Sequence, residues 1–220
     1  MQMRCAKRSA SVRALTGVLT LGSLLLLGGI AGAFARPPEP DPLPQRWELV
    51  LDLGPMRLIT IDVPGVGPQP FFYLTYRVTN NSGQDLQFAP IFDLGNEDGD
   101  LVRGGVDVSK YVRDYLDDLL DNPLLEDQIS IIGPILQGRE NAKDGLVIWR
   151  AVDLDADELA LYAAGFSGET QIVSFTDPES GEPVELTFRK TYMVRYATPG
   201  TIAGRGSRPL EVETQRWIMR

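Results

Sequence analysis

The chain has 220 residues, of which 21 are Lys or Arg and 30 are Asp or Glu, giving a net charge of −9. A surface this acidic repels phosphate backbones, and no basic stripe with interleaved aromatic residues is present, so we expect no nucleic acid partner. There is no histidine, and the single cysteine is Cys5. Once Cys5 is removed with an N-terminal leader, the sequence excludes Ser-His and Cys-His catalysis, and the zinc, copper and iron sites that depend on those ligands.

The first 35 residues predict a signal peptide. Four basic residues and no acidic residue precede an apolar run over residues 14–33, and Ala33-Phe34-Ala35 has the small-x-small form that signal peptidase accepts. We expect cleavage between Ala35 and Arg36, so that the chain meets the membrane only transiently. A retained membrane anchor is the alternative, although several Gly, Ser and Thr residues weaken the run as a spanning helix.

Cleavage leaves 185 of the 220 residues, with 17 of the 21 basic and all 30 acidic side chains, for a net charge of −13. Residues 36–45 contain five prolines and predict an extended linker. Residues 46–220 are long enough for one domain with its own core. Because this domain has no cysteine, its core alone must stabilise it. We expect it in the periplasm, at the cell surface or secreted.

Residues 71–81 predict the central strand. Alternate residues from Phe72 to Val78 are large and apolar, and they run into turn-forming residues at 80–83. This period-two pattern is typical of a strand with one buried face. The opposite face begins apolar and becomes polar towards Arg77, as in a central strand that leaves a covered region.

Similar patterns predict further short strands separated by turns. They cover residues 47–53, 58–63, 86–92 with an interruption at Pro90, a hairpin around 95–100, and then 128–132, 146–150, 158–164, 171–175, 184–196 and 211–219. Many short strands with one helix are typical of a mainly β fold, an antiparallel β-sandwich with one inserted helix. A closed barrel is the alternative, because the number of strands does not separate the two.

The inserted helix is predicted from apolar residues at three- and four-residue spacing, with Asp107 or Ser109 as N-cap and an end at Asn122-Pro123. Its apolar stripe needs cover, and we expect it to close one open end of the sandwich. This stripe consists of Val108, Val112, Tyr115 and Leu119.

The opposite side of the helix is acidic and is a candidate surface for a basic partner. It carries Asp114, Asp117, Asp118 and Asp121.

Two stretches together resemble a known family. In residues 73–99 an apolar strand ends in Asn-Asn-Ser-Gly. In residues 135–165 a Gly-Arg-Glu turn precedes a strand that Gly145 opens and that contains Trp149. These features resemble the exported bacterial immunoglobulin-like domains of unknown function related to mycobacterial immunoprotective extracellular antigens. The resemblance implies an immunoglobulin-like sandwich and export, and it carries no catalytic residue. Gln137 stands where the family's later turn has proline.

Acidic clusters are the remaining candidates for metal chemistry. Asp153, Asp155 and Asp157 have the opening spacing of a calcium loop, but Glu158 and Ala164 stand where glycine and a bidentate glutamate are needed. We therefore expect a solvated connection there. A plain turn is likewise expected at Asn96, Asp98 and Asp100. No metal ligand and no cofactor is predicted.

Three other motifs have simple structural explanations. Ser167 lies in a Gly-rich turn that departs from a nucleophile elbow and has no base to activate it. The Asn80-Asn81-Ser82 triplet fits a glycosylation acceptor but is explained by a turn. Trp47, Trp149 and Trp217 lie in alternating strands and are expected in the core rather than stacked on sugars.

The sequence predicts an exported, non-catalytic binding or accessory module of the cell envelope, with an unknown protein or ligand as partner. The alternative is an envelope hydrolase such as a glycosidase, since that chemistry needs only two carboxylates at the right separation.

Overall fold

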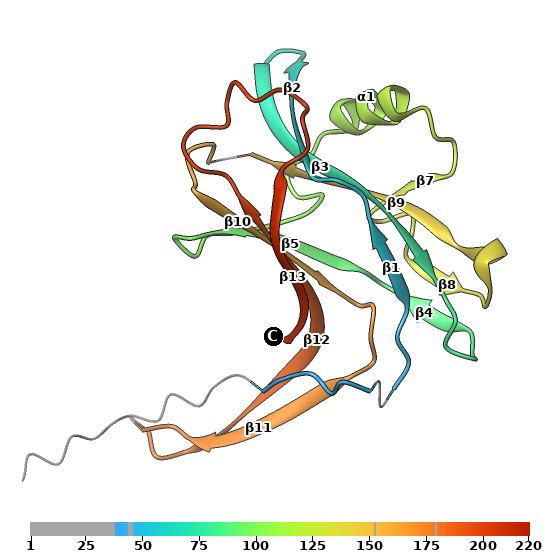
Figure 1. Cartoon of the computed structure of the whole chain (residues 1–220), viewed down its shortest axis with the longest axis vertical. Helices are drawn as coiled ribbons and strands as arrows, with labels where there is room; N and C mark the ends of the chain where they lie inside the picture. Colours follow the sequence, from blue (N-terminus) through green and yellow to red (C-terminus); the bar gives the residue numbers. More distant parts are fainter. Residues whose placement is uncertain (1–37, 44–45, 152, 179) are drawn as a thin grey trace, which may run out of the picture. The chain divides into compact units, whose positions relative to one another are not determined.

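The computed structural model describes residues 38–43, 46–151, 153–178 and 180–220. The predicted signal peptide, with its cleavage position between Ala35 and Arg36, lies outside the described residues. Within them, two open sheets and a single α-helix confirm the predicted mainly β sandwich with one inserted helix (Figure 1).

The first sheet is built around β3 (Gly67–Thr79). β1 and β2 pair with successive parts of one edge of β3, and β9 pairs with the other edge. β7 adds to β9 in parallel, while the other pairings are antiparallel. β3 is therefore the central strand that the sequence predicts. The other strands of this sheet are β1 (Val50–Leu53), β2 (Arg57–Val63), β7 (Leu125–Asp127) and β9 (Lys143–Arg150).

The second sheet is built around β12 (Pro183–Ala197). β10 and β13 pair with its two edges, β11 pairs with its first half, and β5 and β6 follow beyond β10. A separate two-stranded ribbon joins β4 and β8. The bounds are β4 (Leu86–Phe88), β5 (Ile91–Asn96), β6 (Leu101–Arg103), β8 (Gly133–Ile135), β10 (Glu158–Ala164), β11 (Thr170–Thr176) and β13 (Glu211–Met219).

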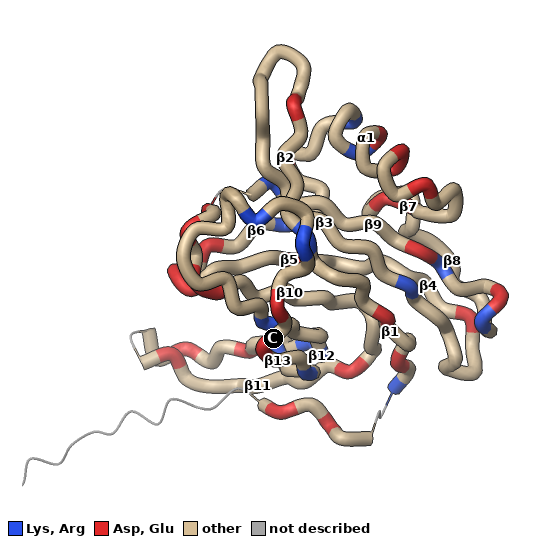
Figure 2. Tube along the Cα trace, turned by 45° about the horizontal axis from the view of Figure 1, so that its top comes forward, with Lys and Arg blue, Asp and Glu red and all other residues tan. Residues whose placement is uncertain are grey.

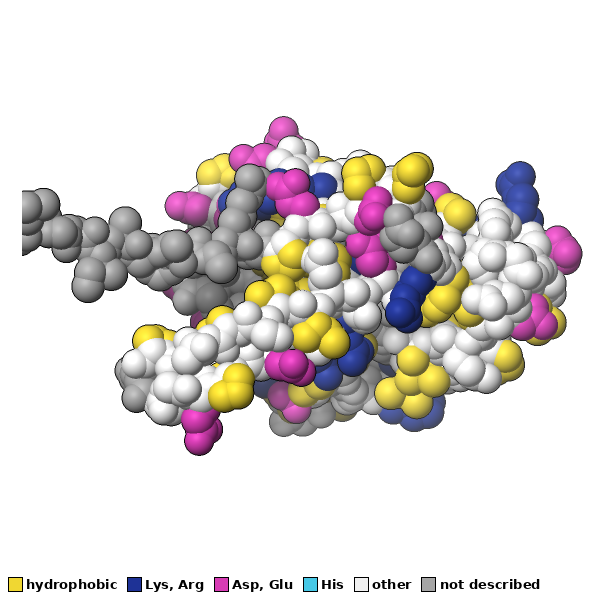
Figure 3. All heavy atoms as spheres, turned by 90° about the horizontal axis from the view of Figure 1, so that it is seen from below, with side chains coloured by type: hydrophobic (Ala, Val, Ile, Leu, Met, Phe, Trp, Pro, Cys, Tyr) yellow, Lys and Arg dark blue, Asp and Glu magenta, His cyan; other side chains and the backbone are white. Residues whose placement is uncertain are grey.

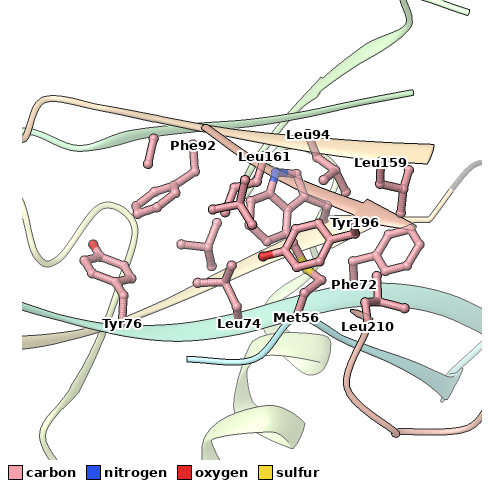
Figure 4. Packing of buried hydrophobic residues seen from close by; sticks show 14 of the residues in the cluster. Met56, Phe72, Leu74, Tyr76, Phe92, Leu94, Leu159, Leu161, Tyr196 and Leu210 are labelled. Atoms are coloured by element: carbon pink, nitrogen blue, oxygen red, sulfur yellow. The ribbon is translucent and has the colours of Figure 1, made fainter. Parts of the chain in front are cut away.

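The main core lies between the two sheets. Aromatic rings meet across it, with the centroids of Tyr76 and Phe92 4.8 Å apart. Tyr76 also lies over Gly145 on the neighbouring strand, where a β-carbon would overlap its ring, so this strand pair requires glycine. Figure 4 shows residues of both sheets that face one another in this core: Phe72, Leu74, Tyr76, Phe92, Leu94, Leu159, Leu161 and Tyr196.

Helix α1 (Lys110–Leu120) covers the outer face of the first sheet. It begins after Ser109, whose Oγ accepts a hydrogen bond from the Val112 N–H at 3.4 Å. Val112 and Leu116 are fully buried against outward-facing residues of β2, β3 and β9. The expectation that the helix closes an open end of the sandwich is therefore wrong. The outer face of β3 is itself apolar and needs cover, and the helix supplies it. The covered residues are Ile61, Phe71, Tyr73, Leu146 and Ile148.

The buried stripe of α1 agrees with the predicted one at Val108 and Val112 but contains Leu116 in place of Tyr115 and Leu119. Val112 and Leu116 lie four residues apart and face the sheet, whereas Tyr115 and Leu119 are 42% and 52% exposed. Both pairs of residues have the four-residue spacing of one helix face, and the sequence pattern alone does not show which pair is buried. The helix is rotated so that Leu119 borders solvent.

Two strand predictions need correction. Pro90 does not merely interrupt one strand: it separates β4 from β5, which belong to different sheets. Residues 128–132, predicted as a strand, form turns, because the Asp127 carboxylate accepts hydrogen bonds from the N–H groups of Ile129 and Ser130 and folds the chain back.

Candidate functional site

The β11–β12 hairpin extends beyond the sandwich (Figure 1). β12 pairs with β11 through residues 183–189, whereas β10 and β13 pair with β12 only from residue 190 onwards. The connecting turn is closed by the Gly181 N–H, which donates to the Asp177 carbonyl at 2.8 Å. The positive φ of 72° at Gly181 suits a residue without a side chain. The hairpin therefore has sheet neighbours only at its base.

One face of this hairpin is apolar and only partly buried. Residues directly opposite each other in an antiparallel pair share a face, so Val173 lies beside Leu186 and Phe175 beside Val184. Phe175 and Leu186 are 44% and 46% exposed. Figure 3 views the molecule from below and shows hydrophobic side chains along the hairpin. We call the set Val173, Phe175, Val184, Leu186 and Phe188 the hairpin apolar face.

The base of the hairpin is closed by a buried ion cluster. The Lys190 Nζ, with a side chain only 4% exposed, lies 2.9 Å from Glu48 Oε2 and 3.1 Å from Glu169 Oε2. It also lies 5.4 Å from the centre of the Trp217 ring. Burial alone would lower the pKa of Lys190, but hydrogen bonds to the two glutamates outweigh burial and raise it. Lys190 is therefore a fixed cation where the sandwich ends and the hairpin begins.

The N-terminal described segment passes over this base. The Asp41 N–H donates a hydrogen bond to Glu169 Oε1 at 2.8 Å. Residues 38–42, the middle of β12 and the end of β13 line a hollow of about 680 Å³, with Lys190 and Trp217 among the lining residues.

The hairpin also carries an open strand edge. Arg189 and Arg220 exchange two backbone hydrogen bonds, at 2.8 and 3.1 Å, where β13 ends. In an antiparallel ladder alternate residues point to the same edge, so the backbone groups of Thr187 and Glu185 face the continuation of that line. No described residue forms a backbone hydrogen bond with them there. This edge can accept another strand.

A smaller pocket, which we call the helix-side pocket, lies between α1, β9 and the turns after β7. Its volume is about 340 Å³. Asp127 lines it and accepts a hydrogen bond from Arg113 Nη1 at 2.8 Å. Burial alone would raise the pKa of Asp127, but hydrogen bonds from Ser130, from the Ile129 N–H and from Arg113 hold it below its usual value. Partial burial raises the pKa of nearby Asp117, which does not line the pocket.

The acidic surface predicted on α1 is present, and all four aspartates are exposed. Figure 2 shows basic residues among the acidic ones on this helix. Asp114 pairs with Lys110 at 2.5 Å, and Asp121 is the C-cap, its N–H bonded to the Asp117 carbonyl. The face is therefore of mixed charge, and its role as a partner surface stays a prediction.

The two acidic clusters of the sequence lie side by side and bind backbone groups. The Glu97 carboxylate accepts a hydrogen bond from the Asp157 N–H at 2.9 Å, and Asn96 Nδ2 donates to Asp153 Oδ2 at 3.3 Å. Asp157 Oδ1 also accepts from the Gly200 N–H. Among the described residues, no three acidic side chains are grouped so as to hold a metal ion. The expectation that these residues hold no calcium ion stays a prediction.

The remaining motifs have structural roles. Asn80 is buried, and its Nδ2 donates to the carbonyls of Gln84 and Ile135, so its amide organises a turn. Ser167 Oγ accepts a hydrogen bond from the Glu169 N–H, also within a turn. Trp149 is fully buried in the core, while Trp47 and Trp217 are partly buried against it.

The alternation in residues 184–196 predicts one strand, but it does not show that the first half projects as a hairpin while the second half lies in the core. The available signal was Lys190, a charged residue inside the apolar stripe between Phe188 and Tyr192.

Comparison of the chain with protein-family models gave no match, and neither the curated proteins nor the solved structures gave a significant match. The resemblance to exported immunoglobulin-like domains therefore stays a prediction. In the part of the chain that the structure describes, no helix is long and apolar enough to span a membrane.

Proposed function

We propose that residues 36–220 act, after export, as a non-catalytic binding module of the cell envelope that contacts a protein partner through the β11–β12 hairpin. The observation that carries this proposal is the hairpin apolar face, which extends past the sandwich with no strand opposite it among the residues that the structure describes.

Two physical arguments support the hairpin as a contact surface. A two-stranded hairpin is marginally stable in water unless its apolar face packs against something, so cover by a partner is favourable. Exposed apolar patches bordered by polar residues are also typical of protein interaction sites.

The open edge at Glu185 and Thr187 supplies a specific mode of binding. A partner strand that continues the line of β13 would hydrogen-bond to this edge and lay alternate side chains beside the hairpin apolar face. The acidic side of α1 is less suited to a basic partner, since its aspartates are intermixed with Lys110 and Arg113.

The test compares two double variants as bait for envelope proteins of the source cell. Phe175→Ser with Leu186→Ser removes the exposed apolar groups, and Ser174→Ala with Thr187→Ala changes two polar side chains on the opposite face of the same hairpin. We expect one protein to bind the unchanged chain and the control, and to be lost from the apolar-face variant. Equal capture by both variants would contradict the proposal.

Export has its own measurement. The intact mass of the protein from its native source should correspond to a chain that begins at Arg36. A full-length mass in the membrane fraction would instead favour a retained anchor.

An envelope glycosidase stays the alternative. Such an enzyme needs two carboxylates flanking one cleft. Among the described residues that line the helix-side pocket, Asp127 is the only acid, and Arg113 pairs with it, whereas Glu39, Asp41 and Glu48 all line the hollow over the hairpin base.

A further inference from the structure

The helix-side pocket has apolar walls on rigid elements. Leu146 and Ile148 of β9 form its floor, and Val108 before α1 contributes to one side. The loop after β6 is fixed against this floor, because the Gly105 N–H donates to the Ile148 carbonyl at 2.8 Å. This hydrogen bond ties one wall of the cavity to β9.

Its rim exposes large aliphatic side chains. Val106, Ile129 and Ile132 line the pocket and are 49%, 75% and 51% exposed. The Asp127 carboxylate fixes the turn that carries Ile129, through hydrogen bonds from the N–H groups of residues 129 and 130. Three aliphatic side chains held beside one concave pocket are typical of a site for the apolar part of a small ligand.

The polar lining has an excess of positive charge in an acidic protein. Arg103 and Arg113 line the pocket with one acid, Asp127. Arg103 Nε donates to Asp93 Oδ1 at 3.1 Å, but Asp93 Oδ2 also accepts from Arg220 at 3.3 Å, so two cations share that carboxylate. The Arg103 side chain is 58% exposed. Arg103, Arg113 and Arg220 thus share two carboxylates, Asp93 and Asp127, and this net positive cluster beside an apolar pocket complements an anionic group.

We propose that the helix-side pocket binds a small anionic amphiphile, specifically an aliphatic carboxylate. Its chain lies over Leu146 and Ile148 and beneath the aliphatic rim, and its carboxylate lies at Arg103. The volume of about 340 Å³ is at the small end of ligand pockets and suits a single chain of this kind.

The test measures binding of decanoate and of decanol to the chain by calorimetry, below the concentrations at which either aggregates. Decanoate should bind more tightly than decanol. Arg103→Gln should weaken the binding of decanoate by about threefold to fivefold, as expected for a half-exposed charge pair. It should leave the affinity for decanol unchanged. The double change Ile129→Ser and Ile132→Ser should weaken the binding of both ligands.

The matched control is Leu119→Ser with Leu124→Ser, two exposed leucines that do not line the pocket. Because all four substituted apolar residues are exposed, the melting temperatures of both double variants should stay close to that of the unchanged chain. Absence of decanoate binding, equal binding of acid and alcohol, or equal loss in the control would each overturn the proposal. The hairpin experiment does not depend on this result.

Discussion

The two halves of β12 share one pattern of residues and lie in different environments. From Tyr192 to Tyr196, alternate side chains pack between the two sheets. From Val184 to Phe188, alternation continues on the same face with no sheet opposite, and Lys190 marks the border. Alternation thus specifies which face of a strand is apolar, while the cover over that face depends on the rest of the chain or on a partner.

The largest expected difference is in the free energy of unfolding when a leucine is replaced by alanine in each of the two regions of the second sheet. Leu161→Ala, in the core, should lower the free energy of unfolding by about 2–5 kcal/mol. Leu186→Ala, on the hairpin, should change it by less than about 0.5–1 kcal/mol because this side chain is nearly half exposed. Urea denaturation of both variants measures the difference. Equal losses would show that the hairpin apolar face is covered in solution.

Helix α1 offers the same comparison on a smaller core. Leu116→Ala should cost about 2–4 kcal/mol, since this side chain is fully buried against β3 and β9. Leu119→Ala, at 52% exposure, should cost less than about 0.5 kcal/mol. Thermal melts of the two variants measure the difference. The reverse order of stabilities would mean that Leu119, and not Leu116, faces the sheet.

The border between the halves is tested by Lys190→Met. This change leaves Glu48 and Glu169 without their cation, and it should cost about 2–3 kcal/mol, less than a fully buried pair because Glu48 is partly exposed. Lys190→Arg is the control that keeps the charge. If Lys190→Met is as stable as the unchanged chain, the ion cluster does not hold the hairpin base.

The raised pKa of Lys190 predicts that its contribution to stability is smaller at alkaline pH. Its pKa is raised in the folded chain above the ordinary value of 10.5, so its contribution is complete below pH 10.5 and is lost as pH rises through the folded pKa. The stability difference between the unchanged chain and Lys190→Met should therefore shrink above about pH 10.5. Melting temperatures of both proteins across pH 8–12 provide the measurement, and a constant difference would contradict the assignment.

Local patterns predicted most of the fold. The alternation around β3, the turn at residues 80–83 and the Ser109 cap are encoded by neighbouring residues. The errors concern contacts between distant residues. The side of the sandwich that α1 covers depends on Phe71 and Tyr73, far from the helix in sequence.

The candidate site was less predictable for the same reason. The sequence indicated the apolar stripe of residues 184–196 but not that the opposite sheet ends before it. The helix-side pocket joins side chains from β9, α1 and the turn after β7, and no short motif brings these together. The turn of residues 128–132 was mistaken for a strand because its isoleucines suggested burial, whereas Ile129 and Ile132 are exposed at the pocket rim.

The backbone pairing of Arg220 with Arg189 has a practical consequence for handling the protein. Any residues fused after Arg220 would leave the sheet alongside the open edge at Thr187. An affinity tag placed there would compete with the proposed partner strand, and a surface coupled through it would hide the hairpin. The exposed turn at residues 98–99, beside β6 at the opposite edge of the second sheet, is the better attachment point.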